Sequence, residues 1–414
     1  MNKLKLHHQI IIAMIVGSLT GFLFKGETDS LVYNIIISMG IIFIRLLKMI
    51  IVPLIFSSIV VGVSSIASGR ALGRIGLKTV AYYFLTSLLA ILIGLSLTNL
   101  IAPGVGTTLA SSNAFDPSSL SKPGSIGEIL IRMIPLNPVH AASTGDMLGI
   151  IFFSILLGVS MTRLEDGSNS FVRKFFESFF KVMMKMTEMI IKLAPLGVLG
   201  LITKVVATTG LAIFISVGKY VVTIALGLSI HILFVLPFIF YVFTGKNPIL
   251  HFRAMAPAMA TAFSTSSSNA TLPMTIKCVE KNAGVSNKVS SFVLPLGATI
   301  NMDGTALYEC AGVLFIAQVL GVDLTMYQQL VIVVTALLAS IGAAGIPSAG
   351  LVMIFIVTQA VGFKDQEVAL IVGTMLAVDR PLDMFRTVVN IFSDSVGTSL
   401  IAKSEGESLY DDMD

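Results

Sequence analysis

The feature that most constrains this chain is a series of long apolar segments separated by short polar stretches. The clearest ones cover roughly residues 9–25, 33–67, 77–102, 147–162, 186–207 and 212–243. A helix needs about 20 residues to cross the hydrocarbon core of a bilayer, and several of these segments reach that length. Only 12% of the residues are charged, against about 25% in a typical soluble domain. The sequence therefore predicts an all-α polytopic membrane protein.

Charge, cysteine content and the N-terminus exclude other classes. A net charge of +4 gives no case for a nucleic-acid partner, and two cysteines are too few for a disulfide framework. Basic residues precede the first apolar run, and no small-residue cleavage site follows it. We expect a retained first helix with a cytoplasmic N-terminus. The short connecting loops favour a multi-pass protein of a prokaryotic plasma membrane.

Two apolar regions after residue 246 are interrupted by polar or small residues. Residues 254–273 contain a run of six polar residues at 264–269, and residues 331–361 contain a Gly-rich interruption at 340–350. Irregular backbone at membrane depth is tolerated only where it is buried in protein or lines a cavity. Paired broken segments point to a transporter's binding site. The alternative is two simple spans, each with a glycine kink.

Five polar residues of the last helix fall on one face. They are Asp379, Asp383, Arg386, Asn390 and Asp394, with spacings of 4, 3, 4 and 4. At ~100° per residue they occupy a stripe about 80° wide. A charged group at the bilayer centre costs at least ~2.5–3.5 kcal/mol, so this stripe predicts a dry cavity that holds ions or substrate. A solvated face or an internal salt-bridge ladder is the other interpretation.

A second polar cluster, Asn301-Met302-Asp303-Gly304-Thr305, lies inside an apolar run. We expect a locally unwound segment whose free carbonyls join the Asn and Asp oxygens. Oxygen ligands suit hard cations such as Na⁺. Glu309, one turn beyond Thr305, is a candidate for carrying a proton or for pairing with a nearby cation.

Four motifs carry a resemblance over nearly the whole chain to the glutamate transporter family, the dicarboxylate/amino acid:cation symporters. The motifs are residues 266–273 (SSSNATLP), residues 301–309 (NMDGTALYE), residues 344–347 (AGIP) and Asp383…Arg386-Thr387…Asn390…Asp394. The resemblance implies eight transmembrane helices plus two re-entrant helical hairpins with inverted repeats, assembled as a homotrimer. It also implies an elevator-type transporter with no enzymatic activity and no organic cofactor.

The resemblance divides the chain into a scaffold and a moving transport domain. Scaffold helices 1 and 2 would cover residues 1–70, and scaffold helices 4 and 5 residues 106–207. The transport domain would comprise helix 3 at 71–105 and the segment 208–403 with both hairpins. Residues 404–414 would form a cytoplasmic tail.

The resemblance also implies which residues bind the substrate, an acidic amino acid such as glutamate or aspartate. Arg386 would pair with its side-chain carboxylate, where a bidentate guanidinium fits well, and Asp383 would hold the α-amino group. The remaining contacts would come from Ser266, Ser267, Ser268, Thr305 and Asn390. The tip of the second hairpin, Ile346 to Gly350, would close over the substrate as a gate.

Three sodium sites are implied in the same way. The first would use Gly297, Asn301, Asn390 and Asp394. The second would use Tyr83, Thr86, Ser87, Asn301 and Asp303. The third matches Thr299, Ser340, Ile341 and Ala343, where the family's usual Thr is replaced by Ala343. Side-chain ligation at that position is therefore not expected.

Two further departures from the family pattern lead to hypotheses. Archaeal members carry an Arg in the first hairpin where this chain has Ser266, and animal members carry one where it has Met384. We expect Arg380, one turn before Met384, to supply the missing positive charge to the substrate site. Glu309 matches the acidic position of proton- and potassium-coupled members, which predicts proton coupling.

Alternatives remain at this point. A neutral amino acid carrier would lack Arg386, and a C4-dicarboxylate carrier would not need Asp383. An ion channel could be lined by the charged stripe, although broken hairpins favour a carrier. A membrane enzyme has little support, because the serine run lacks a nearby base and none of the five histidines falls in the motif region.

Overall fold

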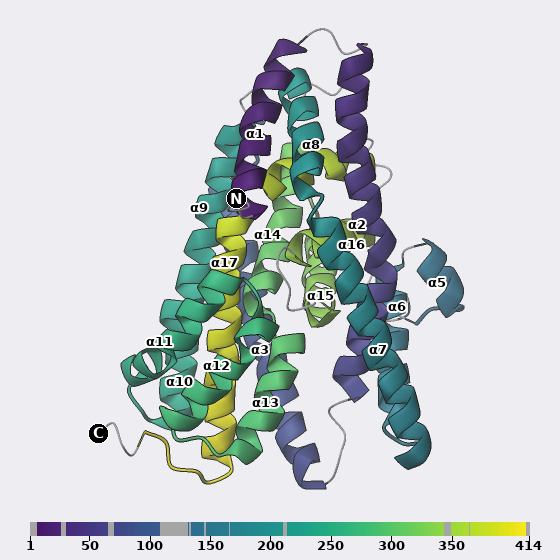
Figure 1. Cartoon of the computed structure of the whole chain (residues 1–414). Helices are drawn as coiled ribbons and strands as arrows, with labels where there is room; N and C mark the ends of the chain where they lie inside the picture. The colour runs from purple at the N-terminus through teal and green to yellow at the C-terminus, as the bar shows by residue number, and fades with distance from the viewer. Residues whose placement is uncertain are drawn as a thin grey trace, which may run out of the picture.

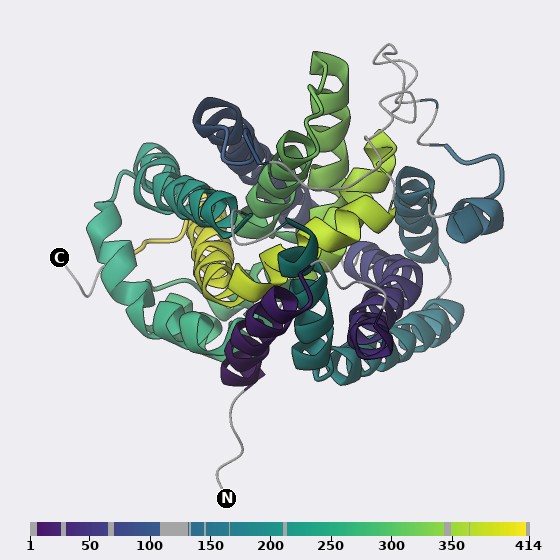
Figure 2. The same ribbon diagram turned by 90° about the horizontal axis from the view of Figure 1, so that it is seen from above.

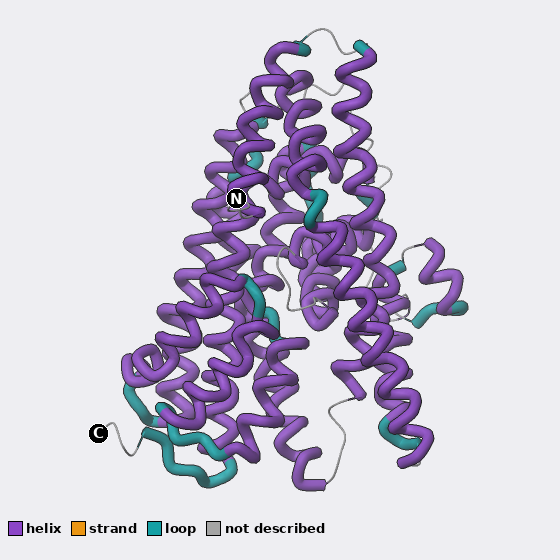
Figure 3. The backbone as a smooth tube through the Cα atoms, in the orientation of Figure 1, coloured by secondary structure: helices purple, strands orange, loops and turns teal. Residues whose placement is uncertain are grey.

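The computed structural model describes residues 6–25, 30–64, 70–107, 131, 134–144, 146–164, 166–209, 213–342, 349–363 and 365–410. The regular secondary structure of these residues is entirely helical, without a strand, and loops connect the helices (Figure 3). The first half forms the following helices: α1 (Leu6–Leu23), α2 (Leu31–Ser64), α3 (Arg70–Ile101), α5 (Pro138–Thr144), α6 (Met147–Met161), α7 (Asp166–Ile191) and α8 (Ala194–Thr209).

The second half contains shorter helices that meet at breaks. They are α9 (Ile213–Ile230), the π-helical turn η2 (His231–Val235), α10 (Leu236–Thr244), α11 (Pro248–Thr265), α12 (Ser268–Lys281), α13 (Asn287–Ile300), α14 (Asp303–Val319), α15 (Met326–Gly342), α16 (Ala349–Val361) and α17 (Asp365–Ser404).

Within the described ranges, three helical segments are long and apolar enough to cross a membrane. They are Leu31–Ser64, Arg74–Ile101 and Phe214–Thr244. The pair Ser170–Ile191 and Ala194–Thr208, bent by 52° between its two parts, passes as a fourth if it is taken as one span. Several of the remaining helices are shorter, and breaks separate the consecutive helices of the second half. The prediction of an all-α membrane protein with broken segments is confirmed.

The helices pack in two groups (Figures 1 and 2). Helices α1, α2, α6, α7 and α8 pack on one another. In the second group, α3, α9–α14 and α16 pack around the long helix α17, and α15 packs on α16, α14 and α3. Contacts between the groups come mainly from α17 against α8, and from the pair α15–α16 against α2 and α6.

The first broken segment is a helical hairpin. Helix α11 ends at Thr265, α12 begins at Ser268, and the two helices pack side by side and against α17. Asn247 caps α11 by accepting from the amide of Ile249, and Pro248 occupies the first helical position, where its missing N–H costs nothing. The second broken segment, α15 and α16, also packs as a pair. Its tip, residues 343–348, lies outside the described residues.

The chain end after α17 binds back onto the second group. Glu405 pairs with Arg74 and Lys78 of α3, and Glu407 accepts from the amide and hydroxyl of Ser286 at the start of α13. Tyr410 is buried and its hydroxyl bonds Nδ1 of His251. The predicted tail is thus docked as far as Tyr410.

Candidate functional site

The polar stripe of α17 is buried. Arg386 is 1% exposed, and the other four residues of the stripe are at most 5% exposed. Leu382, Val389 and Ile391 on the flanking faces belong to the apolar core. Burial of this kind requires partners for each charge. Arg386 pairs with Asp379 and Asp383 of the same helix, and Asp394 accepts a hydrogen bond from Asn301.

Arg386 lies at the centre of a compact ion cluster. Its Nη2 atom is 2.8 Å from Oδ1 of Asp383 and 3.1 Å from Oδ1 of Asp379. Its guanidinium carbon lies 3.7 Å from the centre of the Tyr308 ring, which is a cation–π contact. Nε and Nη1 have no hydrogen-bond partner in the described structure. The guanidinium therefore keeps donors for a further anion.

Arg380 approaches the same cluster from the less buried side. Its Nη1 atom is 3.6 Å from Oδ2 of Asp383, and its side chain is 27% exposed. Asp383 is thus held between Arg380 and Arg386. The expected proximity of Arg380 to the site residues is present, through Asp383.

The predicted unwound segment is real but short. Helix α13 ends at Ile300, Asn301 and Met302 are non-helical, and α14 begins at Asp303. Asp303, Gly304 and Thr305, which were expected to be unwound, already belong to α14. The amide of Gly304 donates to Oδ1 of Asn390 at 2.8 Å, so α17 satisfies one of the free donors of this helix start.

Asp303 is the centre of a second cluster. Its Oδ1 accepts from Ser87 at 2.6 Å and from Thr86 at 3.2 Å, both on α3. Its Oδ2 lies 2.6 Å from the hydroxyl of Ser393 and 3.1 Å from Nε2 of His231. Asp303, Thr86 and Ser87, predicted for the second sodium site, therefore lie together.

Three of the residues predicted for the first sodium site, Gly297, Asn301 and Asp394, also converge. Nδ2 of Asn301 donates to Oδ1 of Asp394 at 2.8 Å, and Oδ1 of Asn301 has no hydrogen-bond partner in the described structure. Gly297 allows the close approach: a Cβ there would lie 2.4 Å from Oδ1 of Asp394 and 2.6 Å from the Tyr83 hydroxyl. Tyr83 itself donates to the carbonyl of Val293. Oxygen atoms from three elements thus meet at one place.

Asn390 connects α17 to the start of α14. Besides accepting from Gly304, it donates to the hydroxyl of Thr305 at 3.3 Å. Gly350, at the start of α16, lies against Arg386: a Cβ on it would be 3.2 Å from Nη1. Thr305, Gly350, Asp383, Arg386 and Asn390 are therefore neighbours.

The tip of the first hairpin has an unusual backbone. Ser266 adopts φ 51° and ψ 37°, a left-handed conformation that is uncommon for a non-glycine residue. Its hydroxyl is buried without a hydrogen-bond partner in the described structure. Ser267 caps α12 by accepting from the amide of Ala270 at 3.2 Å, and Ser268 opens that helix. These contacts run within the hairpin and do not reach Arg386.

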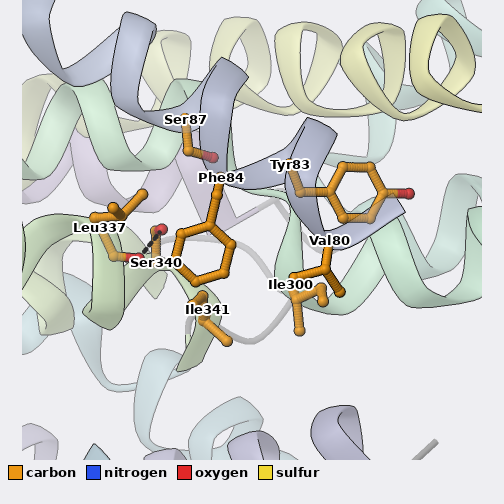
Figure 4. Close-up of a pocket in the computed structure, with 8 residues that line it drawn as sticks. All are labelled: Val80, Tyr83, Phe84, Ser87, Ile300, Leu337, Ser340 and Ile341. Atoms are coloured by element: carbon orange, nitrogen blue, oxygen red, sulfur yellow. Dashed lines mark hydrogen bonds between the residues drawn. The ribbon is translucent and has the colours of Figure 1, made fainter. Parts of the chain in front are cut away.

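The third predicted sodium site falls partly in a small pocket between α3, α13 and α15 (Figure 4). Ser340 and Ile341 line it together with Tyr83 and Ser87, so residues predicted for two different sites share this pocket. Thr299 donates to the carbonyl of Pro295. Ala343, like Ile346 of the predicted gate, lies outside the described residues.

Glu309 is fully buried on α14. Neither carboxylate oxygen has a hydrogen-bond partner among the described residues. The residue next to it, Tyr308, lies under Arg386, so Glu309 sits beside the ion cluster. The role of Glu309 as a proton carrier stays a prediction.

Sequence reasoning missed three residues. Tyr308 lies within the motif 301–309, and Ser393 directly precedes Asp394, so both had a local signal. His231 had none, because it lies 72 residues before Asp303. His231 lies outside the motif region of the sequence, as stated above, and the packing of η2 against α17 brings it to Asp303 in space.

The apolar helices are broken, and they surround a buried set of charged and oxygen-bearing groups. This combination defines a class of membrane transporter that moves ions and solutes through an enclosed site. The profile of the Sodium:dicarboxylate symporter family matches residues 6–404. The chain belongs to this family, and is a transporter and not an enzyme.

Relatives with similar sequences have transport names. "Excitatory amino acid transporter 3" of Mus musculus is 35% identical, covering 96% of this chain and 85% of the relative. "Proton/glutamate-aspartate symporter" of Escherichia coli is 34% identical, covering 97% and 93%. "Excitatory amino acid transporter" of Caenorhabditis elegans is 36% identical, covering 94% and 86%.

Proposed function

We propose that this protein is a sodium-coupled symporter that takes up acidic amino acids, glutamate or aspartate, across a prokaryotic plasma membrane. The observation that carries the proposal is the buried Arg386, which lies beside Asp383 and keeps two guanidinium nitrogens unbonded among the described residues. A desolvated guanidinium with spare donors is suited to a carboxylate. The adjacent Asp383 is suited to an α-ammonium group.

The two charges together select the substrate class. A neutral amino acid would leave Arg386 without its anion, and a C4-dicarboxylate would bring an anion to Asp383. Thr305, Asn390 and Gly350 surround the same place and complete the proposed substrate site. Ser266, Ser267 and Ser268 are proposed to contribute backbone amides, and Ile346 to close the site.

Sodium is the proposed coupling ion. Asn301, Asp303 and Asp394, together with the hydroxyls of Thr86 and Ser87, offer the oxygen atoms that a hard cation prefers. These groups bond one another, and an ion would replace those hydrogen bonds. The relative named for proton symport supports a proton as a second coupled ion, with Glu309 as its carrier.

The packing supports an elevator mechanism. The group of α3 and α9–α17 contains every described residue of the proposed sites, and the group of α1, α2, α6, α7 and α8 contains none. We propose that the first group moves as the transport domain against the second, the scaffold. A homotrimer held by the scaffold is part of the same proposal.

The decisive experiment is uptake of radiolabelled glutamate, aspartate, succinate and alanine into proteoliposomes, with Na⁺, H⁺ and K⁺ gradients imposed one at a time. We expect Na⁺-driven uptake of glutamate or aspartate only. Arg386→Lys should abolish it, since an ammonium group cannot reproduce the bidentate geometry. Succinate uptake at a similar rate, or uptake unaffected by a Na⁺ gradient, would contradict the proposal.

A further inference from the structure

Helix α7 carries a surface feature that the transport site does not use. Four lysines, Lys174, Lys181 and Lys185 on the helix and Lys192 directly after it, are exposed. Their spacings of 7, 4 and 7 residues place them within a stripe about 40° wide. Lys174 and Lys192 are 18 residues apart, or about 27 Å along a helix. Glu188 lies beside the stripe and pairs with Lys185 at 2.8 Å.

A second stripe, of exposed apolar side chains, runs beside the lysines. Phe171, Phe175, Val182 and Met189 are each between 54% and 74% exposed. On the helix they lie about 60–100° from the lysine stripe, on one side of it. The opposite face, with Met183, is the one that packs on α2. The helix thus has three sectors: packed, apolar and exposed, and basic.

This order of sectors is suited to a helix that lies at the boundary between the hydrocarbon core of the bilayer and water. Exposed apolar side chains next to a row of lysines describe an interfacial amphipathic helix. Helix α8 follows α7 after a bend (Figure 1). The bend is 52°, and α8 is apolar. A row of like charges is poorly suited to contact its own copies in an oligomer, and it is complementary to the phosphates of anionic lipids.

We propose that the lysine stripe of α7 binds the headgroups of anionic phospholipids, with Phe175 and its apolar neighbours inserted among the acyl chains. The proposal is independent of which solute the protein carries. It assigns a lipid-binding surface to the scaffold group, outside the transport site.

The chain contains no tryptophan, so one introduced tryptophan reports on a single place. Phe175→Trp puts the probe beside the stripe, and Phe234→Trp puts it at an exposed position on η2 as a matched control. The purified full chain is reconstituted in phosphatidylcholine vesicles. Brominated phosphatidylglycerol is added in increasing amounts to one series and brominated phosphatidylcholine to the other. The quenching of tryptophan fluorescence by the brominated lipid is measured in both.

In the Phe175→Trp variant we expect phosphatidylglycerol to be enriched around the probe by about fivefold or more over phosphatidylcholine. A single lysine that binds an anionic headgroup would give an enrichment of roughly this size. The control should show no preference. The preference should disappear when Lys174, Lys181 and Lys185 are replaced by Gln, and should weaken with added salt while all lysines are retained.

Equal quenching of the Phe175→Trp variant by the two lipids would overturn the proposal. So would a preference that survives both the Gln substitutions and high salt. Weak quenching by either lipid would show that protein, such as a second copy of the chain, covers the stripe instead. The salt titration decides the question even if the triple variant does not fold.

Discussion

Nε2 of His231 lies 3.1 Å from Oδ2 of Asp303, with both side chains fully buried. The histidine belongs to η2, a π-helical turn between α9 and α10, and such turns are frequent at functional sites. Together with Ser393 it fixes one oxygen of the carboxylate while Thr86 and Ser87 face the other. His231 therefore orients a proposed sodium ligand from outside the site.

We predict that His231→Ala weakens the apparent Na⁺ affinity of uptake by about 10-fold or more, because loss of a partner that orients a metal ligand costs roughly 10–100-fold. The maximal rate at saturating Na⁺ should change less. His231→Gln, which keeps a donor, should recover part of the affinity. The measurement is the Na⁺ dependence of aspartate uptake; an identical dependence in the Ala variant would show that His231 has no such role.

Gly297 tests the close approach at Asp394. A Cβ at this position would overlap Oδ1 of Asp394 and the Tyr83 hydroxyl. We expect Gly297→Ala to displace the carboxylate and to abolish Na⁺-dependent uptake while the protein still folds in detergent. Gly218→Ala is the matched control, since a Cβ there meets nothing within 4 Å. Normal Na⁺ dependence in Gly297→Ala would exclude this glycine from the cation site.

Replacement of Arg380 tests whether this residue supplies a second positive charge, besides Arg386, to the substrate site. Its contact with Asp383 is 3.6 Å long and partly exposed, so it contributes about 1 kcal/mol at most. Arg380→Ala should raise the KM for substrate by up to about fivefold or change the counter-ion coupling. Kinetics and ion fluxes that match the wild type in reconstituted vesicles would refute the hypothesis.

Glu309 tests proton coupling. Gln has the same shape and cannot release a proton, so Glu309→Gln should keep Na⁺-driven uptake and lose most of its dependence on external pH. The comparison is uptake between about pH 5 and 8, where a carrier carboxyl is expected to titrate. If the variant keeps the pH profile of the wild type, the proton is carried elsewhere.

Glu405 tests the docking of the chain end. Hydrogen bonds from Lys78 and then Arg74 lower the pKa of this carboxyl from 4.5 to about 2. A pKa that is lower in the folded protein stabilises the fold above the ordinary pKa, and this stabilisation is lost as the pH falls toward about 2. Wild type should therefore melt above Glu405→Gln at pH 7, with the difference shrinking between about pH 4.5 and 2. A difference in melting temperature that stays constant over this range would contradict the assignment.

Local sequence was enough to predict the long apolar helices, the interruptions after Thr265 and Ile300, and the polar stripe of the last helix. Hydrophobic period and length are local properties, so Asp383, Arg386 and Asp394 could be placed on one face of the last helix without a structure. The break at Asn301 could be predicted for the same reason, because an amide and a carboxylate next to glycine interrupt an apolar run.

Which side chains come into contact could be read only from the packing of the helices. Asp303 takes its hydrogen bonds from Ser87, His231 and Ser393, which lie on three elements and up to 216 residues away. The same holds for Tyr410, whose hydroxyl reaches His251 on the first hairpin. A local pattern predicts the face of the helix on which a side chain lies. The partner of that side chain depends on how the helices pack against one another. Helix packing in turn depends on the burial of side chains along the whole chain.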